Sequence, residues 1–163
     1  MKLTGIMIVL AILAALVFSP FGATDVSELL PVQTLCLRTA DGLCRMETDS
    51  GLMGQGKDVA AALEDLKRTA PGVVILSTTR QLVVEDAAAK YFVPLLRLDV
   101  LRPGTELYHA PLPIDACDAS DYLSRHGVQS TVSRAQAAVL EGKNYPLPAL
   151  LGGEGRYYIV DAK

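Results

Sequence analysis

The side chains best suited to chemistry gather in one stretch, where His109, Asp115, Cys117 and His126 fall within eighteen residues. Imidazole, thiolate and carboxylate groups are ligands that zinc takes, and a cysteine beside a histidine can act as a nucleophile. The spacings contain no C-x-x-C, H-E-x-x-H or short H-x-H pattern. We therefore expect no catalytic residue, no metal and no cofactor. His109, Cys117 and His126 remain the candidate residues for a metal site or a ligand pocket.

Two other patterns resemble functional sites without matching one. Glu85-Asp86 and the acidic run from Asp25 to Glu28 are interpreted as helix-start charges and an acidic linker, rather than paired acid and base groups. The segment from Gly51 to Gly56 resembles a phosphate-binding loop but lacks the Lys-Ser/Thr pair of a P-loop. We interpret Ser50 to Gly56 as a flexible connection.

The N-terminal segment indicates where the protein works. Lys2 precedes an uncharged apolar run from Leu3 to Phe18, which is typical of an export signal or a signal-anchor. Signal peptidase prefers small residues at the −3 and −1 positions, and a cut after Ala23 would place Phe21 at −3. We expect residues 1–23 to remain as a single membrane anchor, with residues 24–163 outside the cytoplasm. Cleavage and secretion are the alternative.

Composition limits the rest of the chain to one domain. About 140 residues follow the anchor, which is the usual size of a domain with one core. The formal charge of −3 and the pI near 5.3 give no basic surface to neutralise phosphates, so we expect no nucleic-acid partner. The absence of tryptophan does not favour an aromatic platform for carbohydrate.

An early β-hairpin is the strongest local prediction. Val32–Arg38 and Leu43–Thr48 are strand-like segments joined at Asp41-Gly42, a strong signal for a two-residue hairpin turn. In this register Ala40 faces Leu43.

The hairpin register also bears on the three cysteines, at least one of which must be unpaired. Thr39 faces Cys44 and Cys36 faces Glu47, so the two cysteines point to opposite faces of the strands, which disfavours a bridge between them. We expect small, buried, free thiols. A bond from Cys117 to either of the other two is the alternative.

The remaining chain alternates between helical and strand-like periodicity. Helices are predicted at Lys57–Arg68, from an Asp118 N-cap to Gly127 with His126 on the apolar face, and from a Ser133/Gln136 capping box to Gly142. Strands are predicted at Val73–Leu76, as a central strand buried on both faces, at Glu106–Ala110 and at Arg156–Val160. Leu82–Arg97 is ambiguous, with helix favoured over Glu85–Phe92.

These elements predict an α/β or α+β domain. We expect a small mixed β-sheet of about four to five strands with about three to four helices. An N-terminal transmembrane or signal helix precedes this domain.

The order of elements resembles the N-terminal domain of the C subunit of spore germinant receptors, the Ger(x)C family. The resemblance covers roughly Glu28 to Ala162 and rests on order and hydrophobic pattern. It is carried by an early strand at Glu28–Leu37, the unit Gly56-Lys57-Asp58-Val59 to Lys67, the strand Val73–Leu76 and the stretch Leu95–Arg102.

The chain departs from the family in two respects. Family members carry a lipid on a cysteine just after the signal, and they have two further domains; this chain shows neither. The resemblance implies no catalytic or binding residue that can be transferred to this sequence.

Two functions follow as hypotheses. The first is a membrane-anchored, non-enzymatic interaction domain, similar to a germinant-receptor C subunit, that acts in spore germination or sporulation by docking to an integral membrane partner. The second is an exported ligand-binding protein or enzyme with a pocket between His109 and His126.

The retained anchor can be tested by mass spectrometry of the chain purified from membranes. We expect an intact N-terminal segment, because Phe21 fits the −3 position poorly. A mature chain that begins at Thr24 would refute the retained anchor.

Overall fold

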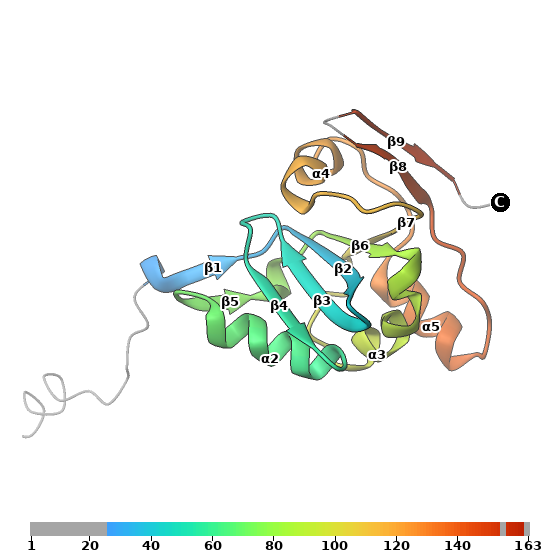
Figure 1. The fold of residues 1–163 in the computed structure, drawn as a ribbon. Helices are drawn as coiled ribbons and strands as arrows, with labels where there is room; N and C mark the ends of the chain where they lie inside the picture. The colour runs from blue at the N-terminus through green and yellow to red at the C-terminus, as the bar shows by residue number, and fades with distance from the viewer. Residues whose placement is uncertain (1–25, 154–155, 162–163) are drawn as a thin grey trace, which may run out of the picture.

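The computed structural model describes residues 26–153 and 156–161, which form a mixed α/β domain (Figure 1). The strands are β1 (Leu29–Pro31), β2 (Thr34–Ala40), β3 (Leu43–Thr48), β4 (Met53–Gly56), β5 (Val73–Ile75), β6 (Gln81–Glu85), β7 (Glu106–Ala110), β8 (Ala149–Gly153) and β9 (Arg156–Val160). The helices are α2 (Val59–Thr69), α3 (Phe92–Arg97), α4 (Ala116–Leu123) and α5 (Val132–Leu140), with short 3₁₀ turns at Val26–Glu28, Leu76–Thr78 and Asp86–Tyr91.

Seven strands form the main sheet, in the order β4-β3-β2-β6-β7-β8-β9. Strands β2, β6, β7 and β8 are parallel, whereas β3, β4 and β9 join their neighbours antiparallel. Strands β1 and β5 form a separate parallel pair. The α/β prediction is therefore confirmed, but the prediction of four to five strands in the sheet was too low.

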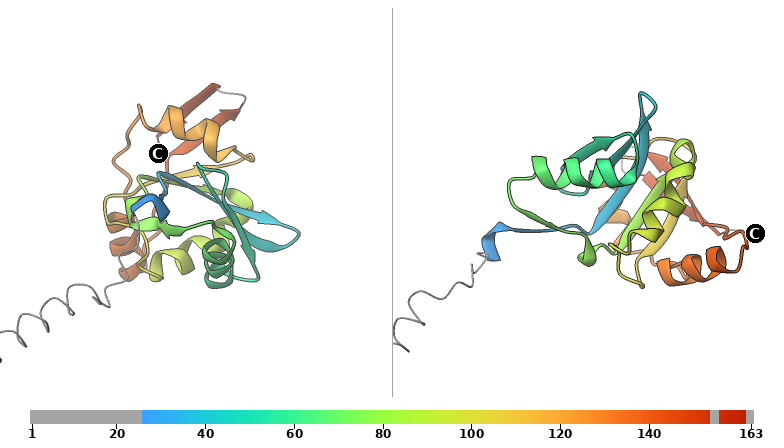
Figure 2. Two further views of the ribbon diagram at one scale, coloured as in Figure 1. Left: turned by 90° about the vertical axis from the view of Figure 1, so that its left-hand side faces the viewer. Right: turned by 90° about the horizontal axis from the view of Figure 1, so that it is seen from below.

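Helices cover the two faces of the sheet unequally. Helices α2, α3 and α5 lie on one face, and α4 lies on the other (Figures 1 and 2). Leu35, Leu37 and Leu82 point into the core on the three-helix side, whereas Val83 and Tyr108 point into the core on the α4 side. Alternate residues of the central strands thus fill two cores, as the period of two in a strand requires.

The predicted hairpin is confirmed in its turn and its register. Ala40 pairs with Leu43 and Cys36 with Glu47. The turn residues Asp41 and Gly42 both have positive φ, at 51° and 78°. This conformation is the one that an Asp-Gly turn of the primed type supplies.

The loop prediction for Ser50–Gly56 holds only for residues 50–52 and is wrong for Met53–Gly56, which form β4. A Cβ atom on Gly54 would lie far inside van der Waals contact with backbone atoms of Ala62 and Leu66, and one on Gly56 would clash with Ala62. The glycines therefore let α2 approach the strand closely. They serve helix-to-sheet packing rather than flexibility.

Helix α2 also closes the outer edge of β4. The Gln55 N–H donates to Asp65 Oδ2 at 2.9 Å, and the Thr69 hydroxyl donates to the Met53 carbonyl at 3.2 Å. The Gln55 hydrogen bond, followed by Arg68, lowers the pKa of Asp65 below its usual value. Two side chains of α2 thus occupy edge groups that another strand would otherwise bind.

The prediction of Val73–Leu76 as a central strand is wrong. Strand β5 pairs only with β1, and Val73 is half exposed. The central strand is instead β6, whose five residues are all buried. Its polar ends misled the prediction, because Gln81 and Glu85 find internal partners in Thr34 and Arg38.

Both predicted helix caps near the C-terminus need correction. Helix α4 is capped by Asp115 and not Asp118, since Asp115 Oδ1 accepts from the Cys117 and Asp118 N–H groups at 2.9 and 3.0 Å. The helix ends at Leu123, so His126 lies beyond it and is exposed.

The Ser133/Gln136 capping box does not form either. The N-cap of α5 is Thr131, and Gln136 Nε2 donates to the Leu96 carbonyl at 2.9 Å. The glutamine thus ties α5 to α3 instead of turning back to its own helix.

Three other predicted elements agree with the structure. Helix α2 matches the predicted Lys57–Arg68 helix, with Asp58 as its N-cap, and β7 and β9 have the predicted bounds. The ambiguous Leu82–Arg97 segment divides into β6, a 3₁₀ turn and α3, with Pro94 in the first turn of α3.

No helix in the described part of the chain is sufficiently long and apolar to cross a membrane. The predicted anchor at residues 1–23 lies outside the described residues.

The close approach of α2 predicts a large effect of Gly54→Ala. Because the added methyl group meets backbone atoms, we expect a loss of roughly 2–3 kcal/mol in the free energy of unfolding, measured by denaturant titration of the full chain in detergent. Gly104→Ala is the matched control, since nothing lies within 4 Å of its Cβ position. Equal stability of the two variants would refute this role of Gly54.

Candidate functional site

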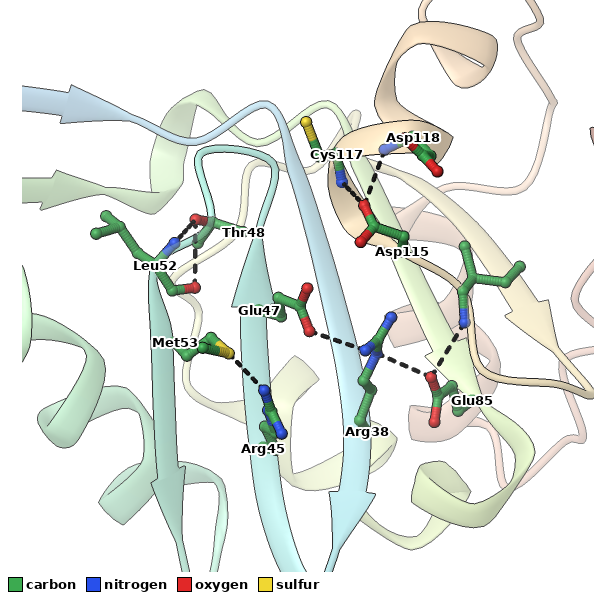
Figure 3. A network of polar contacts seen from close by, with 11 residues as sticks. Arg38, Arg45, Glu47, Thr48, Leu52, Met53, Glu85, Asp115, Cys117 and Asp118 are labelled. Carbon is green, nitrogen blue, oxygen red and sulfur yellow. Dashed lines mark hydrogen bonds and ion pairs between the residues drawn. The ribbon is translucent and has the colours of Figure 1, made fainter. Parts of the chain in front are cut away.

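Arg38 lies between two carboxylates near the carboxyl ends of the parallel strands. Arg38 Nη1 is 2.9 Å from Glu47 Oε2 on β3, and Arg38 Nε is 2.9 Å from Glu85 Oε1 on β6 (Figure 3). Arg38 Nε and Glu47 Oε2 are buried and make no aligned hydrogen bond, so charge rather than hydrogen-bond geometry holds the cluster. We call Arg38, Glu47 and Glu85 the Arg38 cluster.

The Arg38 cluster continues to the segment before α4. Glu85 Oε1 also accepts from the Ile114 N–H at 3.4 Å, and the next residue, Asp115, caps α4. One carboxylate therefore joins β6, β2 and the start of α4. Ligands of parallel α/β sheets commonly bind at this edge, but here the guanidinium and the Asp115 carboxylate are already engaged within the protein.

Burial sets the protonation behaviour of this region. Desolvation raises the pKa of Glu85, against the attraction of Arg38 and the hydrogen bond from Ile114. Burial likewise raises the pKa of the Cys36 thiol to about 12, although Arg38 opposes the shift. Cys36 is therefore a protonated, unreactive thiol at neutral pH.

His109 lies at the end of β7, where its Nδ1 atom is 3.0 Å from Asp86 Oδ1. Cross-strand register places His109 opposite Val84 of β6, and Asp86 follows β6 directly. Both side chains are accessible to solvent. The pair is an exposed contact between neighbouring strand ends.

Cys117 and His126 line a separate hollow of about 310 Å³ on the surface of α4. The His126 ring stacks on Tyr122 with centroids 4.1 Å apart. His126 Nδ1 lies 2.9 Å from the Tyr122 carbonyl, which can only accept, so Nδ1–H is the donor in this contact. His109 does not line this hollow. The structure thus brings two of the three candidate residues together and leaves the third apart.

A buried tyrosine holds the backbone of His126 in place. The Tyr108 hydroxyl is 2.9 Å from Glu106 Oε2 and 3.0 Å from the His126 carbonyl. Burial, followed by the bond to Glu106, raises the pKa of Tyr108, so the hydroxyl remains a hydrogen-bond donor.

The cysteine predictions are confirmed in part. All three thiols are free. Cys36 and Cys44 are buried, and burial raises the pKa of Cys44 to about 11. The prediction of burial is wrong for Cys117, which is exposed in the first turn of α4.

Sequence reasoning missed the Arg38 cluster although the hairpin register contained a signal. The register places Arg38 directly opposite Arg45. Like charges in this position repel and require nearby carboxylates. Glu47 lies two residues after Arg45 on β3 and could be identified as a partner from the sequence. Glu85 could not, because it comes from a strand distant in sequence.

The described residues contain no group of three or more His, Cys, Asp or Glu side chains that could hold a metal ion. The fold and site together define a mixed α/β domain with an internally paired charge cluster near the carboxyl ends of its central strands. No family model matches the chain, and no match was found among curated proteins or solved structures.

The Arg38 cluster predicts a pH-dependent effect of Arg38→Met. Removal of the cation leaves two largely buried carboxylates unpaired, and we expect a loss of about 3–5 kcal/mol in unfolding free energy at pH 7. Because the pKa of Glu85 is raised, its favourable contribution is full below the ordinary value of 4.5 and is lost as the pH rises through the folded-state pKa. The difference from wild type should therefore shrink as the pH falls from 8 towards 4.5, because Glu85 becomes protonated in the folded state and no longer needs the cation.

Denaturant titration between pH 4 and pH 8 provides the measurement. Arg68→Met is the matched control, because the Arg68 side chain is exposed on α2 and its loss should have little effect. A pH-independent difference between Arg38→Met and wild type would contradict the electrostatic role of the cluster.

Proposed function

We propose that this protein is a membrane-anchored, extracytoplasmic and non-enzymatic interaction domain, similar to a germinant-receptor C subunit, that acts in spore germination or sporulation. In this proposal residues 1–23 hold the domain at the membrane. The domain then docks to an extracytoplasmic segment of an integral membrane protein.

An apolar groove between α3 and α5 is the observation that carries this proposal. Leu96, Val139 and Leu140 contribute its apolar surface, and its volume is about 450 Å³. Leu140 is 88% exposed, which is unusual for a leucine in a domain that buries most of its aliphatic side chains. An exposed apolar patch with a polar border is typical of a protein interaction site.

The charges around the groove favour a protein over a lipid surface. Its border carries both Arg97 and Asp99, and the whole chain has a formal charge of −3. Anionic headgroups attract basic clusters and would be repelled by such a chain. A protein segment with an apolar centre and mixed charges complements this border.

The internal use of polar groups also supports an interaction domain. Arg38 is bracketed by two carboxylates, and Asp115 caps a helix. These groups are not available for proton transfer or substrate binding without disruption of the fold.

A second candidate is a ligand site in the hollow lined by Cys117 and His126. The exposed His126 ring and the exposed Cys117 thiol favour it, since both line the hollow and could contact a small molecule there.

Cross-linking in native membranes tests the main proposal. We expect wild type to cross-link to an integral membrane protein, and Leu140→Lys to lower the yield about tenfold, because a charge would enter the apolar centre of the interface. Leu112→Lys is the matched control, since Leu112 is 65% exposed and does not line the groove. Equal yields for wild type and Leu140→Lys would refute docking at this groove.

Germination and sporulation assays separate the two candidate functions. Alanine at His109, Cys117 and His126 should leave both processes unchanged if the groove carries the function. Loss of function in that triple variant, with Leu140→Lys behaving as wild type, would favour the ligand site instead.

A further inference from the structure

The outer edge of β9 is open. Strand β9 pairs with β8 on one side, and no strand of the described chain pairs with its other side. In an antiparallel strand, alternate residues direct their N–H and C=O groups away from the existing partner. These groups form an edge that another strand can bind.

The side chains of β9 do not protect this edge. Tyr158 and Val160 are 56% and 45% exposed, Arg156 is the only charged residue of the strand, and the strand contains no proline. The opposite end of the same sheet differs, because Asp65 and Thr69 occupy edge groups of β4. The fold therefore closes one edge of the sheet and leaves the other available.

We propose that β9 pairs antiparallel with β9 of a second copy of this chain, about a two-fold axis that passes through the Ile159 pair. Tyr158 of each copy then lies opposite Val160 of the other. Aromatic and β-branched residues form favourable cross-strand pairs, worth roughly 0.2–1 kcal/mol each. On the opposite face, Tyr157 is buried against α4, so the exposed Tyr158 and Val160 side chains carry the contact.

Self-complementarity is the reason for choosing a second copy as the occupant. In this register the exposed Tyr158 of one copy meets the exposed Val160 of the other, so a single sequence supplies both halves of the interface. Arg156 lies outside the paired centre, and no like charges are placed opposite each other there. The two-fold axis is perpendicular to the sheet, and an axis normal to a membrane would leave both N-termini on the same side.

The small size of the interface predicts a weak dimer. Five residues at about 3.4 Å each span only about 17 Å, and such a contact buries less than the roughly 1,200 Å² of a stable complex. Anchoring both copies in one membrane would compensate by raising their effective concentration. The inference uses a different surface from the α3–α5 groove and extends the proposed function.

A charge-exchange experiment tests the register. The full chain is studied in detergent by sedimentation equilibrium over a wide concentration range. We expect a concentration-dependent dimer for wild type, and at least about tenfold weaker association for Tyr158→Lys and for Val160→Glu. The double variant should recover association, because each introduced lysine then faces an introduced glutamate of the other copy.

Two controls keep the result interpretable. Leu140→Lys should dimerise as wild type does, and thermal unfolding should show that every variant is folded. A wild-type chain that stays monomeric would overturn the inference, as would single variants that associate like wild type or a double variant without recovery. If the β9 dimer is not found but Leu140→Lys still loses cross-linking, the proposed function remains supported. The dimer and the proposed function can therefore fail separately.

Discussion

The ion pairs of Arg38 hold together parts of the domain that differ in topology. Strand β2 lies where the antiparallel strands β3 and β4 meet the parallel strands β6 and β7. Arg38 contacts Glu47 on the antiparallel side and Glu85 on the parallel side, and Glu85 also accepts from Ile114 before α4. A single cation thus connects the antiparallel and the parallel strands to helix α4. Because the three charges are largely buried, the loss of one would leave the others without solvent compensation.

The same topology explains why the two ends of the sheet differ. The antiparallel side ends at β4, where α2 follows directly and packs against the strand through Gly54 and Gly56. Asp65 and Thr69 of that helix can then reach the strand edge. The parallel side ends in the β8–β9 hairpin, and no helix follows β9 in the described chain. Among the described residues, the β4 edge is therefore the one that the following helix covers.

Sequence reasoning succeeded where local chemistry decides the structure. The Asp41-Gly42 turn determined the hairpin register, and helical periodicity located α2. Sequence reasoning failed where contacts between segments distant in sequence decide the structure. A polar residue such as Gln81 or Glu85 marks the end of a strand in isolation, but Thr34 and Arg38 make both positions suitable for burial. The spacing of the candidate site residues likewise could not show that β7 carries His109 away from the hollow on α4.

The pairing of charges inside the domain restricts how it can recognise another molecule. Its buried thiols are protonated, and its buried arginine already has two partners. In the proposed function, recognition uses exposed apolar surface, such as that on α5 at Leu140 and on β9 at Tyr158 and Val160. Since these surfaces belong to separate elements, binding at one leaves the other accessible. A dimer through β9 would present two α3–α5 grooves to the same membrane, and a weak contact at each groove would become a stronger bivalent attachment.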